Sequence, residues 1–149
     1  NEAQIRHPRK GFGFVVPRSE NSSLMACTFV DKKYAGRVPK GKALLRAFAG
    51  GAYGKSALAQ NDTALMASVQ KDLEMLLGIR GEPVFRSLKR YPSAMPQYGV
   101  NHEEIVKYLS RIRATFPGLY FTGSAYRGTG IPDCVHDAEE TAQAILLEL

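Results

Sequence analysis

A glycine-bearing loop that runs straight into a helix is the part of this sequence best suited to chemistry. The loop is predicted over residues 123–130 and carries Gly128 and Gly130, and the helix is predicted to open at Ile131-Pro132-Asp133. Glycine lets a main chain approach a ligand closely, and proline suits the first helical turn because its missing N–H group is not needed there. The unpaired amides and the positive end of the helix dipole then favour an anion or an electron-rich carbonyl group. A tight turn with no ligand is the alternative interpretation, because glycine is common in loops.

Two glycine-rich runs approach nucleotide-binding motifs without matching them. Residues 128–133 depart from the dinucleotide fingerprint G-x-G-x-x-G at its last position. Residues 49–56 depart from a P-loop because Ala49 stands where the first glycine should be. Both departures count against a free-standing nucleotidase.

The histidines and cysteines do not have the spacing of metal ligands. We therefore expect exposed or capping roles for His7, His102 and His136, and no metal site. No Ser-His-Asp order and no pair of carboxylates stands out, so no catalytic acid or base is identified. Cys134 falls just inside the predicted last helix, where the dipole could lower the pKa of its thiol, but a packed and unreactive thiol is favoured.

The first half of the chain is predicted to form a small sheet and one helix. Strands are expected at residues 11–16, 24–30 and 43–49, and their short connections favour an antiparallel meander. A helix should begin at Asn61 or Asp62 and end at Gly78. Its buried face is predicted to carry Leu65, Val69, Leu73 and Leu76.

The second half is predicted to be a helix–strand–loop–helix tail. A strand over residues 84–89 and an irregular, proline-interrupted segment over 91–98 should precede it. Asn101 and Glu104 have the spacing of a capping box, and Pro117-Gly118 should end that helix. Its expected buried stripe is Ile105, Leu109, Ile112 and Phe116. A short strand at 119–122 and a last helix over 133–147 follow, with Ala138, Ala142 and Ile145 expected to face inward.

Composition places the chain among ordinary globular proteins of the α+β class. Its 149 residues are 44% hydrophobic and 23% charged, which excludes wholesale disorder and collagen-like sequence. Two cysteines do not make a disulfide framework, so a reduced compartment is the simpler expectation. The formal net charge of +6 favours anionic partners such as nucleic acid, anionic lipid or carboxylate-bearing substrates.

One basic segment has the beginning of an RNA-binding motif. Lys10-Gly11-Phe12-Gly13-Phe14-Val15-Val16 follows the RNP1 pattern, but Pro17 takes the place of its last aromatic residue. Only nine residues precede Lys10, too few for the strand and helix that carry the companion aromatic motif. An ordinary strand is therefore favoured, and no nucleic-acid partner is expected.

The loop and last helix carry a longer and more specific pattern. Residues 118–134 read GLYFTGSAYRGTGIPDC and resemble the C-terminal "PGLYLAGxAYRGxGIPDC" of the FAD-dependent protoporphyrinogen/coproporphyrinogen oxidases, in the flavin amine oxidase superfamily. Four more segments resemble that family in the same order along the chain. They are residues 13–20 ("GFLVPRSE"), 25–29 ("ACTW"), 41–46 ("GKVLLR") and 94–98 ("AMPQY").

The resemblance implies a fold, a cofactor and a set of contacts. Residues 1–100 would belong to a substrate-binding domain with an antiparallel or mixed sheet, and residues 101–149 would complete a FAD-binding domain. Thr129, Gly130 and Ile131 would lie against the flavin, and the last helix would point its dipole at the N1/C2=O edge of the ring. Tyr91 stands where the family usually has tryptophan, and would border the flavin from another loop.

The implied function is that of the C-terminal part of an oxidase in heme biosynthesis. The flavin would take hydride equivalents from a porphyrinogen, and molecular oxygen would reoxidise it. The family's N-terminal G-x-G-x-x-G segment is absent from these 149 residues, so this chain alone is expected to be inactive and to hold FAD weakly. A cytoplasmic location is expected, with peripheral membrane attachment and self-association as further expectations.

Two other functions stay open at this point. Another oxidase of the flavin amine oxidase type would share the architecture, although the AYRGxGIPDC wording argues against it. A non-catalytic basic domain could bind RNA or acidic surfaces, and would do so with a strong dependence on salt.

Overall fold

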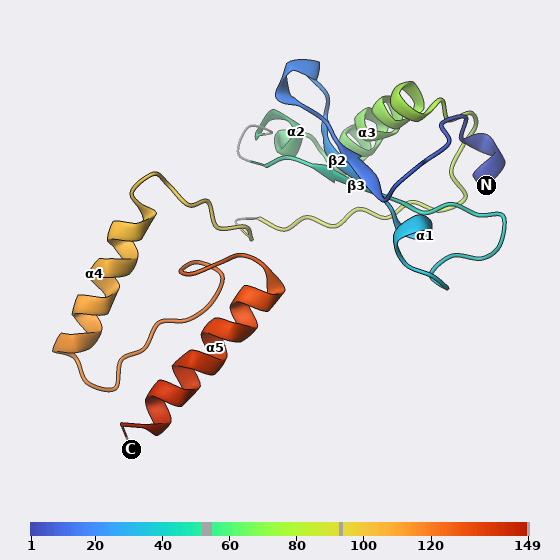
Figure 1. Ribbon diagram of the computed structural model, residues 1–149. Coiled ribbons are helices and arrows are strands. Elements are labelled where there is room, and N and C mark those ends of the chain that lie inside the picture. Colours follow the sequence, from blue (N-terminus) through green and yellow to red (C-terminus); the bar gives the residue numbers. More distant parts are fainter. Residues whose placement is uncertain (52–54, 93, 149) are drawn as a thin grey trace. The chain divides into compact units, whose positions relative to one another are not determined.

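The computed structural model describes residues 1–51, 55–92 and 94–148, with only the backbone at residues 55 and 56 (Figure 1). The chain forms two compact units, Asn1–Lys89 and Arg90–Leu149. The P-loop-like run over 49–56 includes residues 52–54, which lie outside the described residues. The functional boundary expected after residue 100 stays a prediction.

The first unit is built on the predicted antiparallel meander. Three strands pair in the order β1-β2-β3, each antiparallel to its neighbour. They are β1 (Gly13–Val15), β2 (Leu24–Phe29) and β3 (Leu45–Ala49). Two short helices, α1 (Val30–Lys33) and α2 (Lys55–Ala59), and the long α3 (Asp62–Leu77) complete this unit, with 3-10 turns at Glu2–Gln4 and Arg18–Glu20. The start of α1 corrects the sequence analysis, which extended the second strand to Val30.

The core of this unit lies between the sheet and α3. Its fully buried side chains are Cys27 and Phe29 of β2 and Leu77 of α3. Burial raises the pKa of the Cys27 thiol to about 11, so this side chain is neutral at physiological pH and packs as a small apolar group. Phe14 of β1 packs against the same cluster, with its ring centroid 6.0 Å from that of Phe29. It is therefore not presented for stacking on a nucleic-acid base.

Helix α3 corrects one predicted core residue. Leu65, Val69 and Leu73 face inward as expected, but Leu77 is buried and Leu76 is exposed. Adjacent helical positions differ by about 100° around the axis, so both leucines continue the stripe equally well. The way α3 lies on the sheet selects Leu77.

The two helices that begin after an asparagine offer a matched test of capping. The Asn61 side chain accepts a hydrogen bond from the Ala64 amide at 2.9 Å. Within the described residues, the Asn101 side chain makes no capping hydrogen bond at the start of α4 (His102–Thr115). Replacing Asn61 with alanine should lower the free energy of unfolding by about 1 kcal/mol. Asn101→Ala should leave it nearly unchanged. Chemical denaturation of both variants measures the difference, and an equal cost would contradict the capping role of Asn61.

Two predicted strands do not form. Residues 84–89 and 119–122 belong to no strand and have no ladder partner among the described residues. A strand exists only when a neighbour accepts and donates its backbone hydrogen bonds, which a local pattern of apolar residues does not supply. The irregular segment expected over 91–98 is confirmed for its described residues.

The second unit consists of α4, an irregular segment and α5 (Ile131–Leu146), and several predicted inward faces are wrong here. Ile105 on α4 and Phe116 just after it are exposed, and the expected capping box is not made among the described residues. Residues that do face inward on α4 are Val106, Leu109 and Ile112.

On α5 the expected Ala138, Ala142 and Ile145 are exposed, and the inward residues are Cys134, Asp137, Thr141 and Ala144. Helix α5 faces a loop whose polar backbone needs partners, so its inward stripe is partly polar.

Within the residues that the structure describes, no helix is both long and apolar enough to cross a membrane.

Candidate functional site

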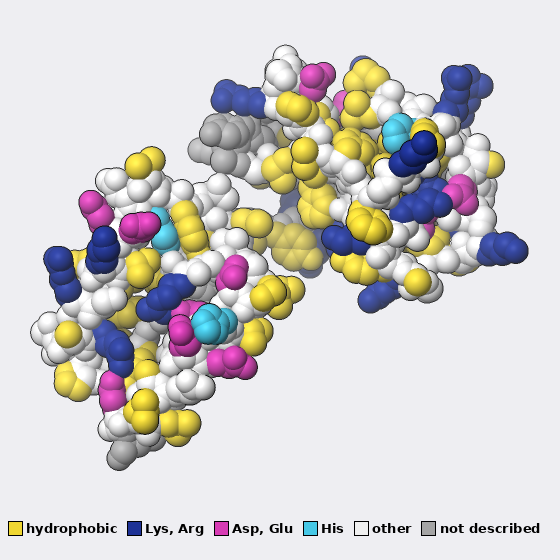
Figure 2. All heavy atoms as spheres, in the orientation of Figure 1, with side chains coloured by type: hydrophobic (Ala, Val, Ile, Leu, Met, Phe, Trp, Pro, Cys, Tyr) yellow, Lys and Arg dark blue, Asp and Glu magenta, His cyan; other side chains and the backbone are white. Residues whose placement is uncertain are grey.

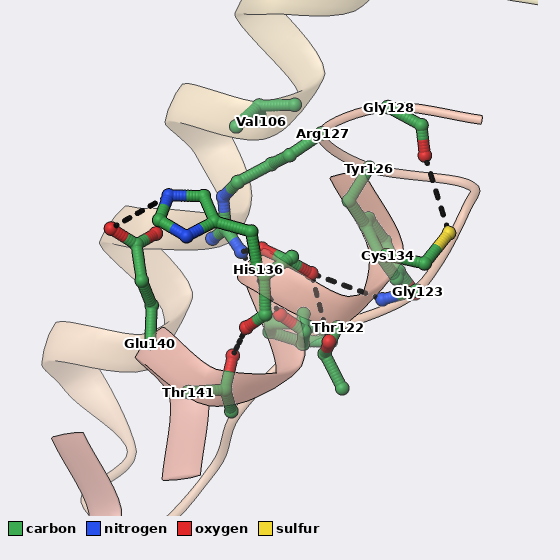
Figure 3. A network of polar contacts seen from close by, with 12 residues as sticks. Val106, Thr122, Gly123, Tyr126, Arg127, Gly128, Cys134, His136, Glu140 and Thr141 are labelled. Carbon is green, nitrogen blue, oxygen red and sulfur yellow. Dashed lines mark hydrogen bonds and ion pairs between the residues drawn. The ribbon is translucent and has the colours of Figure 1, made fainter. Parts of the chain in front are cut away.

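A buried carboxylate holds the predicted loop against α5. Asp137 is 4% exposed and accepts hydrogen bonds from the Thr122 hydroxyl at 2.8 Å and from the Gly123 amide at 3.1 Å. Figure 3 labels Thr122, Gly123 and Arg127 in this network. Asp137 also forms an ion pair with Arg127, whose guanidinium donates in addition to the Phe121 carbonyl oxygen at 3.3 Å. One side chain of α5 thus binds both ends of the chain segment 122–127.

The electrostatics of Asp137 follow from these contacts. Burial alone would raise the pKa of this carboxyl group, because it removes the charged form from water. The hydrogen bonds from Arg127, Thr122 and Gly123 outweigh burial, so the pKa lies below its usual value. Asp137 is therefore ionised at neutral pH and acts as an acceptor rather than as a general acid.

Two aromatic side chains hold the loop from the segment before it. The Tyr98 hydroxyl donates to the Ser124 carbonyl oxygen at 2.8 Å and accepts from the Gly128 amide at 2.8 Å. The His102 ring lies parallel to the Tyr98 ring, with centroids 3.8 Å apart, and its Nε2 is 2.7 Å from the Tyr126 carbonyl oxygen. Through Tyr98, the 94–98 motif forms hydrogen bonds with the 118–134 motif. The sequence analysis did not predict this contact.

The start of α5 shows why its glycines are required. Gly128 has φ +146°, and a Cβ added there would lie 2.5 Å from the Cβ of Asp133. We call residues 129–131, where the loop enters α5, the helix mouth. The Gly130 amide donates to Asp133 Oδ2 at 3.2 Å, so the Asp133 carboxylate already accepts a hydrogen bond from one of the three amides there. Pro132 is in the first turn, as predicted.

The four predicted cofactor-binding residues are only partly brought together. Thr129, Gly130 and Ile131 are contiguous at the mouth of α5, and Ile131 is 82% exposed. In the described part of the chain, the Thr129 and Ile131 amides donate to no protein acceptor. Tyr91 belongs to the same unit and is also exposed, but no hydrogen bond or ring contact joins it to the loop within those residues. Thr129 and Ile131 are therefore accessible to a ligand. The expected contact of Tyr91 with a flavin stays a prediction.

A groove of about 330 Å³ lies between α4, residues 120–127 and α5. Its polar lining is Ser110, Arg113, Tyr120, Tyr126, Arg127, Glu140 and Thr141. None of residues 128–131 lines it, so it is a different place from the helix mouth. Arg113 is paired with Glu148 at 2.5 Å and lies over the Tyr120 ring, which ties the ends of α4 and α5 together.

The remaining histidines and Cys134 each lie beside a polar group of the protein. His7 accepts the Arg9 amide at 2.9 Å, and His136 is exposed beside Glu140. Cys134 is half-buried, with Sγ 3.6 Å from the Gly128 carbonyl oxygen. No cluster of metal-ligating side chains exists among the described residues.

Comparison with known proteins matches nearly the whole chain. Coproporphyrinogen III oxidase of Bacillus subtilis is 35% identical over 149 residues, which are 99% of this chain and 32% of that protein. The chain is homologous to the porphyrinogen oxidases. Mitochondrial protoporphyrinogen oxidase of Nicotiana tabacum is 25% identical over 95% of the chain and 29% of its own length. No protein-family model matches.

A solved structure agrees with this homology in three dimensions. A crystal structure from Exiguobacterium sp. 255-15, assigned as a protoporphyrinogen oxidase, has a TM-score of 0.83 and 35% identity over 95% of this chain. The match covers 32% of that protein. The chain thus spans about a third of the length of the porphyrinogen oxidases that it matches. The family resemblance noted in the sequence is confirmed.

Proposed function

We propose that this chain acts as the C-terminal part of a FAD-dependent oxidase that converts a porphyrinogen to a porphyrin in heme biosynthesis. The observation that carries the proposal is the 35% identity to a coproporphyrinogen III oxidase over 99% of the chain. It is supported by the meeting of the 94–98 and 118–134 motifs at the mouth of α5.

The helix mouth fits the electron-rich edge of a flavin. The Thr129 and Ile131 amides lie at the positive end of a sixteen-residue helix, where they would donate hydrogen bonds to a carbonyl oxygen and stabilise negative charge. The Asp133 carboxylate takes the Gly130 amide and adds a negative charge close by. Of the three residues expected to face the ring, Gly130 would therefore offer no amide hydrogen bond to the flavin. Its missing side chain would let the backbone approach the ring closely. When bound, FAD would supply the two-electron oxidation, with oxygen as the final acceptor.

The open face of the sheet fits a large apolar substrate. Cross-strand partners share a face, so Val15, Ala26 and Phe48 form a row on the side of the sheet opposite the core. Val15 is 77% exposed and Phe48 is 40% exposed. Arg46 is paired with Thr28 next to this row and offers a cation to a propionate. Figure 2 shows Lys and Arg side chains around the margin of this unit and hydrophobic side chains between them.

The second unit fits one part of a larger flavin-binding domain. Residues 119–122 are extended between α4 and α5, with no strand beside them among the described residues (Figure 1). Exposed apolar side chains on α5, such as Val135 and Leu146, also have no cover there. A sheet supplied by the rest of a longer protein would satisfy both. Cytoplasmic location, peripheral membrane attachment and self-association stay predictions.

A chimera tests the proposed function. The 149 matched residues of the Bacillus subtilis coproporphyrinogen III oxidase would be replaced by this chain. We expect the purified chimera to retain FAD through gel filtration, measured by flavin absorbance, and to consume oxygen with coproporphyrinogen or protoporphyrinogen. The control is the same relative truncated before the matched segment. A folded chimera that retains no flavin would contradict the proposal.

A further inference from the structure

The Thr129 peptide is flanked by two amides whose directions are fixed by side chains. The Gly128 amide donates to the Tyr98 hydroxyl, and the Gly130 amide donates to Asp133. Thr129 itself is exposed, and its amide makes no hydrogen bond within the described residues. The direction of this amide is therefore set by the hydrogen bonds of its two neighbours.

Tyr98 and His102 together hold alternate residues of the loop. Tyr98 bridges Ser124 and Gly128 through one hydroxyl group, and the stacked His102 reaches the carbonyl oxygen of Tyr126 between them. A histidine nitrogen that meets a carbonyl oxygen at 2.7 Å must carry a proton, so Nε2 is the donor. On its other side, Arg127 is held by Asp137. The loop is thus held by Tyr98 and His102 on one side and by Asp137 on the other, and we call the pair Tyr98 and His102 the clamp.

We propose that Tyr98 and His102 are positioning residues, which present the Thr129 and Ile131 amides to the flavin edge. This inference rests on the proposed function. Tyr98 is 42% exposed, so its side chain is not part of a buried core. Its removal should loosen the loop without unfolding the unit, because the ring and its stack on His102 remain.

Hydrogen exchange on the full 149-residue chain tests the clamp itself. In Tyr98→Phe the Gly128 amide loses its acceptor, and we expect it to exchange about 10-fold faster. Tyr108→Phe is the matched control, because Tyr108 is an exposed tyrosine on α4. It should leave the Gly128 rate unchanged. Equal rates in wild type and Tyr98→Phe would overturn the proposal.

FAD affinity in the chimera tests the positioning role. We expect Tyr98→Phe and His102→Phe each to raise the Kd of FAD about 5- to 10-fold, with the urea midpoint close to that of Tyr108→Phe. His102→Phe keeps an aromatic ring but loses the donor, whereas His102→Gln keeps a donor near the position of Nε2. His102→Gln should therefore restore an affinity close to wild type.

The two proposals fail in different ways. A wild-type chimera without FAD affinity would overturn the proposed function and this inference with it. FAD binding that is normal in wild type and unchanged in Tyr98→Phe would overturn only the positioning role. A loss of affinity that matches an equal loss in Tyr108→Phe would also overturn it, because the effect would not come from the clamp.

Discussion

Replacing Asp137 with asparagine should lower the free energy of unfolding of residues 90–148 by about 2 to 3 kcal/mol at neutral pH. The carboxylate is nearly inaccessible and accepts from a guanidinium, a hydroxyl and an amide. Asparagine keeps one acceptor oxygen but cannot form the ion pair with Arg127. That arginine is 44% exposed, so water partly hydrates its stranded charge, and the cost stays below that of a fully buried pair.

The same variant has a defined dependence on pH. The pKa of Asp137 is lowered in the folded state, so its contribution is complete above the unfolded pKa, which is about 4. The contribution disappears as the pH falls through the folded pKa, because a protonated carboxyl group no longer attracts Arg127. Wild type and Asp137→Asn should therefore differ strongly at neutral pH and converge in acid.

Urea titrations followed by the amide signals of residues 90–148 measure this difference. Glu139→Gln is the matched control, because it changes an exposed carboxylate of α5 into an amide. It should alter the free energy of unfolding by less than about 0.5 kcal/mol. A gap between wild type and Asp137→Asn that stays constant down to strongly acidic pH would show that the charge of Asp137 is not its source.

Replacing Gly128 with alanine should distort the helix mouth and prevent tight FAD binding. The new Cβ would lie 2.5 Å from Asp133 Cβ, and φ is +146°, where residues with side chains are strained. Strain and overpacking together should lower the free energy of unfolding of residues 90–148 by about 2 to 4 kcal/mol. Relief requires the backbone at residue 128 to move away from Asp133, and we expect this shift to weaken the hydrogen bond from its amide to Tyr98.

FAD affinity of the chimera gives the functional readout for Gly128→Ala. We expect the Kd to rise about 100-fold or more, since about 1.4 kcal/mol corresponds to a factor of ten. Gly99→Ala is the matched control in the same unit, because Gly99 does not have a positive φ and a Cβ there would meet nothing within 4 Å. Its Kd should equal that of the parent. Normal FAD affinity in a folded Gly128→Ala chimera would exclude the loop from the flavin site.

Tertiary contacts explain where sequence reasoning about the second unit went wrong. Ile105 and Ile145 were expected inside because apolar residues recur at helical spacing, yet both are exposed. The inward face of α5 instead carries Asp137, because the loop beside it offers Arg127 and backbone groups that require an acceptor. An isolated carboxylate in a helix gives no local sign of such burial. Tyr98 and Gly128 are thirty residues apart in the sequence, so no periodic pattern of residues predicts their contact.

The amino-acid sequence alone predicts the three-stranded meander, helix α3 between Asn61 and Gly78, and the glycine loop that leads into Pro132. These features depend on caps, turn residues and alternation, which act between neighbours in the chain. The five motifs of the sequence analysis also predict homology to the porphyrinogen oxidases, which the comparison confirms. Tertiary contacts were needed to show that Leu77 is buried rather than Leu76, and that residues 119–122 have no ladder partner among the described residues. They were also needed to show that Asp137, Tyr98 and His102 hold the loop. Such choices depend on which surface a helix or strand meets, and that surface comes from residues far away in the sequence.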